Sequence, residues 1–197
     1  MDSKNKKNIV VGCLLVSILT MIGCGPFTNT VVQLKRDRYI CAIDPNQFIQ
    51  FQGKRILLSS ITDESKNTTN LAYYNPERTV GYQLFYSKEH EMQQPVVSYF
   101  WYALQKAFEC AGIKIEEHGK NYDVELSLII NSLTDEEMKF RVLLIKKGTL
   151  AHQRDYVVTT PKVQTKTLAV LEKRAYGMLD SIVLTILNDP DFQKAFF

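Results

Sequence analysis

The stretch Tyr122–Leu128, YDVELSL, is the part of this 197-residue chain that best predicts the fold. Apolar residues alternate strictly with polar ones along it, so an extended strand here has one apolar face and one polar face. A strand with one buried face and one wet face is typical of an antiparallel sheet. The apolar face carries Tyr122, Val124, Leu126 and Leu128.

Further strands are predicted on both sides of this stretch. Downstream, residues 139–147 and 150–159 form two strands, with Lys147-Gly148-Thr149 as their turn, and together the three strands make a meander. Upstream, the aromatic stretch 71–86 is predicted to form a hairpin around an Asn75-Pro76 turn. Short strands are also expected at 38–43 (RYICAI), 54–62 (KRILLSSIT) and 113–117.

Two amphipathic helices complete the pattern. Pro95 suits the first position of a helix and Gly112 the position after its end, which predicts a helix over 95–111. A second helix is expected at about 165–187, ended by Asn188-Asp189-Pro190 and followed by a short apolar tail, DFQKAFF. Both have apolar residues at i, i+3, i+4 and i+7 spacing. The first stripe is Val96, Phe100, Ala103, Leu104, Ala107, Phe108 and Ala111, and the second is Leu168, Leu171, Ala175, Met178, Leu179, Ile182, Val183 and Ile186.

Strands and helices segregate along the chain rather than alternate, which favours the α+β class. The predicted architecture is a mostly antiparallel sheet with two helices packed on one face. Residues 38–197 are expected to form this single domain, and residues 24–37 to form a tether in front of it.

The N-terminus has the features of a secretory signal peptide. Three lysines lie in the first eight residues, and an uncharged run of fourteen residues follows at 9–22. A basic start followed by an apolar run of about 7–15 residues is typical of a signal peptide, whereas a membrane-spanning helix needs about 20 apolar residues. An uncleaved membrane anchor is the alternative.

The apolar run ends in Met21-Ile22-Gly23-Cys24, which resembles a bacterial lipobox. In that motif the peptidase cuts after the small residue, here Gly23. The cysteine, here Cys24, becomes the first residue and carries a diacylglyceryl thioether and an N-acyl chain. Val10-Val11-Gly12-Cys13 has the same pattern, but only four apolar residues would precede its thiol. Residues 1–23 are therefore predicted as the signal peptide and residues 24–37 as a lipidated tether.

Cleavage after residue 23 would leave a nearly neutral body. It removes three lysines and one aspartate from the 24 basic and 21 acidic residues, which leaves 21 and 20. Nucleic-acid binding is not expected, because it calls for a clustered basic face. Besides Cys24, the mature chain keeps Cys41 and Cys110, which either pair in an oxidising envelope or remain as two buried thiols, and the second alternative is preferred.

No catalytic or metal-binding motif is recognised in the sequence. His90, His118 and His152 stand far apart without an HExxH pattern, and each is expected to be a solvated surface residue. There is no GxSxG nucleophile elbow and no glycine-rich phosphate loop. The prediction is therefore a protein that is not an enzyme and needs no metal or cofactor.

The predicted hairpin has an unusual concentration of aromatic residues. Tyrosine is enriched at protein interfaces, which makes this hairpin a candidate partner-binding surface. The alternative, which is slightly favoured, is that the rings form an outer layer of the core. The residues are Tyr73, Tyr74, Tyr82, Phe85 and Tyr86.

The lipobox-like start joined to a small α+β body is similar to bacterial envelope lipoproteins, and the body resembles the ABC-type transport auxiliary lipoproteins. The likeness is one of architecture over about residues 50–187: a strand at 54–62, a variable loop, a helix at 95–111 and a long strand at 122–133 with its hairpin partners. The resemblance implies a non-catalytic accessory or adaptor subunit of an envelope transport system, anchored to the membrane by its lipid and bound to protein partners.

Two alternatives to this function remain open. One is a structural or assembly lipoprotein that docks on an outer-membrane or secretion complex, and the other is a carrier that binds an apolar ligand between sheet and helices. Gly25, the residue after the lipidated cysteine, resembles the default that sends lipoproteins to the outer membrane, so the protein is expected there, facing the periplasm.

The lipidation site can be tested by substitution. Cys24→Ser removes the thiol that stands directly at the end of the apolar run, so the variant is expected to incorporate no labelled acyl chain in cells. Incorporation at the wild-type level would show that the anchor is assigned to the wrong residue.

Overall fold

The computed structural model describes residues 30–34, 38–65, 73–74, 81–86, 96–116, 119, 121–134, 136–164 and 167–197. For 30–34, 73–74, 81–86, 96–99 and 168 the description covers the backbone only. The predicted signal peptide and Cys24 lie outside the described residues. Within the described part of the chain, no helix is long and apolar enough to cross a membrane.

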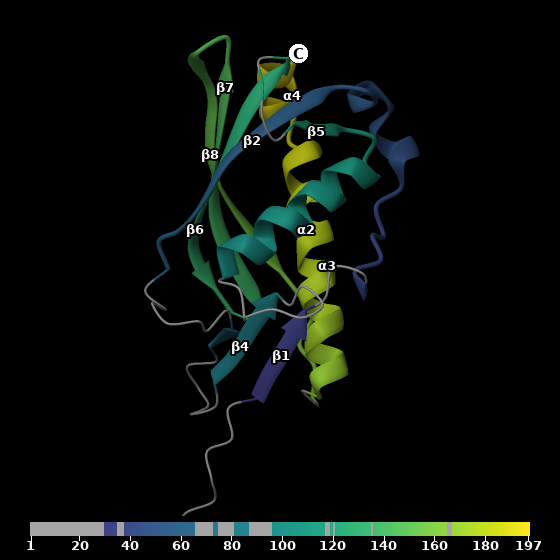
Figure 1. Cartoon of the computed structure of the whole chain (residues 1–197), viewed down its shortest axis with the longest axis vertical. Coiled ribbons are helices and arrows are strands. Elements are labelled where there is room, and N and C mark those ends of the chain that lie inside the picture. The colour runs from purple at the N-terminus through teal and green to yellow at the C-terminus, as the bar shows by residue number, and fades with distance from the viewer. Residues whose placement is uncertain are drawn as a thin grey trace, which may run out of the picture.

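The main sheet has five strands in the order β5-β2-β6-β7-β8 (Figure 1). The meander predicted from the sequence is confirmed, since β6 pairs with β7 and β7 with β8, both antiparallel. A two-residue turn joins β7 to β8, and its residues Lys147 and Gly148 have φ of 52° and 77°, as a twisted hairpin requires. The strands are β2 (Arg55–Asp63), β5 (Lys114–Glu116), β6 (Val124–Leu133), β7 (Glu137–Lys146) and β8 (Thr149–Thr159).

The α+β class is confirmed, but the sheet is mixed rather than mostly antiparallel. Strand β2 runs parallel to both of its neighbours, β5 and β6. Between β2 and β5 the chain passes through helix α2 (Val96–Cys110), which is the long crossover that a parallel pair needs. The alternation of β6 correctly indicated its buried face, but it carries no information about the direction of a neighbouring strand.

A second, three-stranded sheet lies at one end of the molecule, with the order β1-β4-β3 (Figure 1). Strands β3 (Tyr73–Tyr74) and β4 (Gly81–Tyr86) are antiparallel, which confirms the aromatic hairpin. Strand β1 (Thr30–Leu34) pairs in parallel with β4 along its whole length. Residues 30–34 are therefore a strand, and the expected tether over 24–37 is corrected there.

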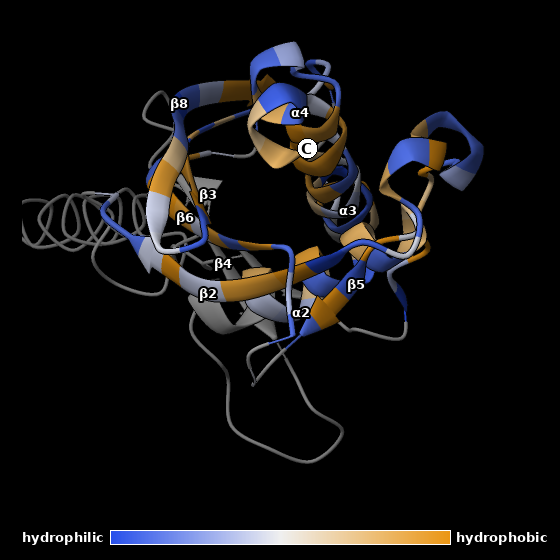
Figure 2. Ribbon diagram, turned by 90° about the horizontal axis from the view of Figure 1, so that it is seen from above, coloured by the Kyte–Doolittle hydropathy of each residue, from blue (hydrophilic) through white to orange (hydrophobic). Residues whose placement is uncertain are grey.

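The helices pack against one face of the main sheet, as predicted. Figure 2 shows the sheet curling around its apolar side, with α3 (Leu168–Leu187) and α4 (Pro190–Phe196) between β8 and β5. Every described residue of the two predicted helical stripes is buried. Burying a side chain such as Phe108 or Leu179 contributes roughly 1.5–3 kcal/mol. Buried side chains of the sheet include Ile56, Leu58, Val124, Leu126, Leu128, Ile130, Phe140, Val142 and Leu144.

The described residues form four helical segments rather than two. The predicted apolar tail is the helix α4, with Asp189 as its N-cap, Pro190 at its first turn, and Phe192 and Phe196 buried. The stretch Asp44-Pro45-Asn46 leads into a 3-10 helix, η2 (Pro45–Phe51), in which Asp44 caps the N-terminus. Both short helices begin with a proline that comes directly after a capping aspartate. The signal for their start is therefore present in the sequence.

The strand predicted at 38–43 is wrong. The described backbone here joins no sheet and runs against helices α2 and α3 instead. The Tyr39 hydroxyl donates to Oδ1 of Asp180 at 2.5 Å, and the backbone N–H of Ala42 donates to Oδ2 at 3.2 Å. The segment thus donates these hydrogen bonds to a carboxylate on α3 and not to a neighbouring strand.

Gly112 and Gly177 provide a matched pair of substitutions. Gly112 ends α2 with φ of +86°, and a Cβ there would lie 2.9 Å from Cγ of Gln52. Gly177 is inside α3 with open space beside it. We expect Gly112→Ala to lower the free energy of unfolding by about 1–2 kcal/mol and Gly177→Ala to raise it by up to about 1 kcal/mol. Urea denaturation of the two variants measures both changes, and changes of the same sign would contradict this description.

Candidate functional site

The structure describes the backbone of all five predicted hairpin residues, while Gly23, Cys24 and Gly25 lie outside the described residues. Tyr73 is paired with Tyr82 across β3 and β4. Phe85 and Tyr86 are paired with Gln33 and Leu34 of β1. The aromatic residues are thus brought together at the backbone level, in a small sheet separate from the five-stranded one. Their use as a contact surface stays a prediction.

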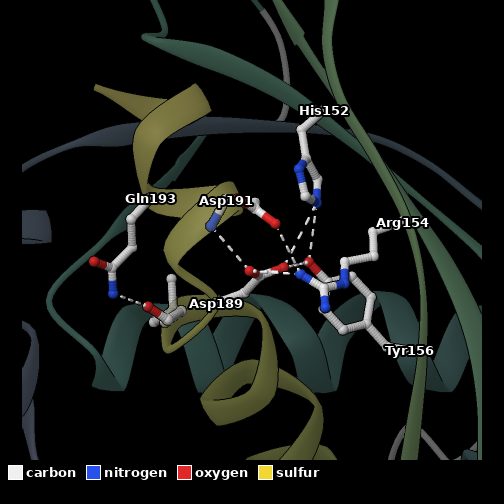
Figure 3. Close-up of polar contacts among 7 residues, drawn as sticks. His152, Arg154, Tyr156, Asp189, Asp191 and Gln193 are labelled. Carbon is white, nitrogen blue, oxygen red and sulfur yellow. Dashed lines mark hydrogen bonds and ion pairs between the residues drawn. The ribbon is translucent and has the colours of Figure 1, made fainter.

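A polar cluster that the sequence did not predict joins β8 to the start of α4 (Figure 3). His152, Arg154 and Tyr156 are every second residue of β8, so they share one face of the strand. All three point to Asp189, whose side chain is only 5% exposed. The expectation of a solvated His152 is wrong, because its side chain is 7% exposed and packs edge-on against Phe192.

The Asp189 carboxylate is almost fully occupied by hydrogen bonds. The Tyr156 hydroxyl donates to Oδ2 at 2.5 Å, and Arg154 Nη1 donates to Oδ1 at 2.9 Å. The backbone N–H of Asp191 donates to Oδ1 at 3.0 Å, as in a helix cap. His152 Nε2 lies 2.9 Å from the Tyr156 hydroxyl and 3.9 Å from the carboxylate.

These contacts shift two pKa values in opposite directions. Burial by itself would raise the pKa of Asp189, but the hydrogen bonds from Tyr156 and Asp191 and the charge of Arg154 outweigh it, so the pKa of this carboxyl lies below its ordinary value. Burial and the adjacent carboxylate raise the pKa of Tyr156. The cluster holds an ionised carboxylate and a neutral tyrosine. Its hydrogen bonds and ion pair attach β8 to the start of α4.

A second buried carboxylate, Asp180, accepts hydrogen bonds from the segment 38–43. Besides its two hydrogen bonds with that segment, the attachment includes the Tyr39 ring, which packs against Tyr176 with ring centroids 5.5 Å apart. Lys106 of α2 donates to the Tyr39 carbonyl at 2.5 Å. Burial and the bond to Asp180 raise the pKa of Tyr39. Residues that precede the domain core are therefore attached to both main helices.

A groove of about 470 Å³ lies at the end of the molecule where α4 and the β7–β8 turn are found, an end that Figure 1 shows. We call it the distal groove. Its apolar wall includes Phe197, which is 52% exposed, packs on Phe51 and has the Lys54 ammonium 5.6 Å from its ring centroid. Residues of both charges surround this wall. The groove is lined by Lys54, Tyr122, Asp123, Glu125, Ile145, Lys146, Lys147, Gly148, Phe196 and Phe197.

The described residues contain no group of three or more histidine, cysteine or acidic side chains placed to hold a metal ion. Sequence reasoning did not find the distal groove, because its residues come from four separate segments. The only sequence signal was the apolar end of DFQKAFF. The two carboxylate clusters could have been suspected from aspartates placed at a helix end or in an apolar stripe, but their partners lie far away along the chain.

No protein-family model matches the chain, and no curated protein matches it. Among solved structures, it is similar to protein XCC0632 from Xanthomonas campestris, which is described as belonging to family DUF330. That similarity has a TM-score of 0.56 and 14% sequence identity, over 84% of this chain and 97% of the other. An uncharacterised protein gives a TM-score of 0.42 and 13% identity, over 69% and 94% of the two chains. The first likeness shows a shared fold.

The Asp189 cluster predicts a pH-dependent loss of stability. Because the pKa of Asp189 is lowered by folding, its contribution is present above the ordinary carboxyl pKa and is lost as the pH falls through the lower folded value. Asp189→Asn is expected to cost about 2 kcal/mol at pH 7, and the difference from wild type should shrink toward pH 3. Urea denaturation at the two pH values measures it.

Asp155→Asn is the control for this experiment. Asp155 also has a lowered pKa, caused by its hydrogen bond from Arg141, but it is exposed to solvent. This substitution should change stability little at either pH. An Asp189→Asn penalty that is the same at pH 7 and pH 3 would show that the charge of the carboxylate does not matter.

Proposed function

We propose that the protein is a membrane-anchored envelope lipoprotein that acts as a non-catalytic accessory or adaptor subunit of an envelope transport system. The observation that carries the proposal is the joining of Gly23-Cys24, at the end of a short apolar run, to a compact α+β domain. The fold shared with a Xanthomonas DUF330 protein supports a bacterial origin for this architecture.

The position of β1 supports an orientation for the anchored domain. Five residues lie between Cys24 and Thr30, and the six steps from one to the other span at most about 20 Å in an extended chain. Strand β1 lies at the end of the molecule opposite the C-terminus (Figure 1). A lipid on Cys24 would therefore place β1, β4 and β3 near the membrane and turn the distal groove away from it.

The distal groove is the surface that we propose for a protein partner. An exposed Phe197 ring on an apolar wall, surrounded by Lys54, Asp123 and other charged residues, resembles the apolar centre and polar rim of a protein interface. The tyrosine hairpin, near the opposite end, is a second proposed contact surface. An adaptor with one surface near the membrane and one away from it can hold two components at a fixed separation.

The two alternatives receive different support. An assembly lipoprotein on an outer-membrane or secretion complex would use the same anchor and the same groove, so only the identity of the partner separates it from a transport subunit. A carrier of apolar ligands needs space between sheet and helices. Large, fully buried side chains such as Phe108, Phe140 and Phe192 occupy that region, which favours the adaptor over the carrier.

Site-specific crosslinking in intact cells tests the adaptor function. A photoreactive residue at position 197 is expected to capture a permease or substrate-binding subunit of a transporter, identified by mass spectrometry. Val157 of β8 is the control, because it is also 52% exposed but is not part of the distal groove. Capture of a β-barrel or secretion component alone would favour the assembly alternative, and capture of the same partner equally from both positions would exclude the distal groove as the docking site.

A further inference from the structure

Two cysteines from distant parts of the chain lie close together where the segment 38–43 passes the end of α2. Cys41 is in the segment 38–43, and Cys110 is the last residue of α2. Both carry free thiols and are partly exposed. A hydrogen bond with Cys110 is among the causes that raise the pKa of the Cys41 thiol, which places the two side chains close together. Neither has a part in the proposed adaptor function.

The register between the segment and α2 explains why these thiols meet. Lys106 donates to the Tyr39 carbonyl and also lies over the Tyr39 ring, 5.3 Å from its centroid. From Lys106 to Cys110 the helix rises about 6 Å, and from Tyr39 to Cys41 an extended chain advances about 6.6 Å. Lys106 and Cys110 are one turn apart on the same face of α2, so the contact between Lys106 and Tyr39 brings Cys41 near Cys110.

Cys41 is held in this place from both sides. The residues that flank it, at positions 39 and 42, are bonded to the same carboxylate, Asp180 of α3. The Cys41 sulfur also accepts the backbone N–H of Ile43 at 3.5 Å. Rotation of the segment away from α2 would break the two bonds to Asp180, so the two thiols remain neighbours in the folded protein.

We propose that Cys41 and Cys110 form an intramolecular disulfide in the mature protein. This inference rests on the proposed envelope location, which supplies an oxidising compartment. Both S–H bonds break and one S–S bond forms, and the two electrons and two protons pass to a disulfide-carrying oxidant, which becomes a dithiol.

The bond would join the anchored end of the chain directly to the core. The residues that precede Cys41 are attached to the domain through the segment 38–43 and through the pairing of β1 with β4. With the bridge in place, the segment 38–43 would also be joined to α2 by a covalent bond, in addition to the contacts of Tyr39 and Asp180. Burial and the hydrogen bond to Cys110 raise the pKa of Cys41 to about 12, so oxidation at neutral pH is expected to need a thiol–disulfide exchange partner.

Thiol counting on the full chain, expressed in a Gram-negative cell, tests the pair. Cells are quenched with acid, and denatured protein is treated with a maleimide polymer before and after reduction. The mature lipoprotein is expected to take no tag before reduction and two after it, because Cys13 has been removed and Cys24 is a thioether. Cys41→Ser and Cys110→Ser should each take one tag without reduction. Two tags on the wild type without reduction would overturn the proposal.

A displaced thiol is the matched control. In a variant with Cys110→Ser and Glu109→Cys, the thiol moves by one residue, about 100° around the helix, to an exposed position. This variant should take two tags without reduction. If it is protected as well as the wild type, the pairing does not depend on the register described above.

The same assay separates failure of this inference from failure of the proposed function. An unprocessed chain keeps Cys13 and Cys24 and takes two additional tags both before and after reduction, which would contradict the lipoprotein assignment. The pair is then judged on the purified full chain in a glutathione redox buffer. Formation of the bridge there, with a melting temperature about 5–10 °C above that of the reduced protein and no such shift in Cys41→Ser, supports the pairing. A folded chain that stays unbridged overturns it.

Discussion

The rest of the structure depends on the burial of one face of the main sheet beneath α2 and α3. From Val124 to Ile130 on β6 and from Met138 to Leu144 on β7, every second side chain is buried beneath the two helices. Removal of these side chains from water is the dominant favourable term in folding. It also fixes the register of the strands, because a slip by one residue would turn the apolar set toward solvent.

Two segments outside this core are attached by the same device. In each, a tyrosine hydroxyl donates to an aspartate that is buried or nearly so: Tyr39 to Asp180, and Tyr156 to Asp189. A buried carboxylate is costly unless its oxygens are hydrogen-bonded. Asp180 therefore selects one position for the segment 38–43, and Asp189 selects one for α4. These hydrogen bonds fix the position of the two segments, which apolar contacts alone would leave free to slide along the core.

The two attached segments lie between the proposed lipid anchor and the distal groove, where the partner is proposed to bind. The segment 38–43 connects β1, near the proposed membrane end, to the core, while α4 forms a wall of the distal groove. An adaptor needs these two joints to be rigid, because any movement at either one would change the distance between membrane and partner. In this interpretation Asp180, Asp189 and the pair Cys41 and Cys110 have one purpose, which is to keep the ends of the molecule fixed relative to each other.

The sequence by itself determined the α+β class, the two long helices, the meander and the aromatic hairpin, because periods of 3.6 and 2 residues and the turn residues around Asn75 and Gly148 are local signals. It also placed the lipobox-like cysteine. Only the tertiary structure decided that β2 is parallel to its neighbours, that residues 30–34 form a strand, that RYICAI does not, and that the His152 side chain is only 7% exposed. The physical reason is that these features depend on partners far along the chain. The Asp180 carboxylate, which accepts the hydrogen bond of Tyr39, lies 141 residues later in the chain. No local period in the sequence indicates such a contact.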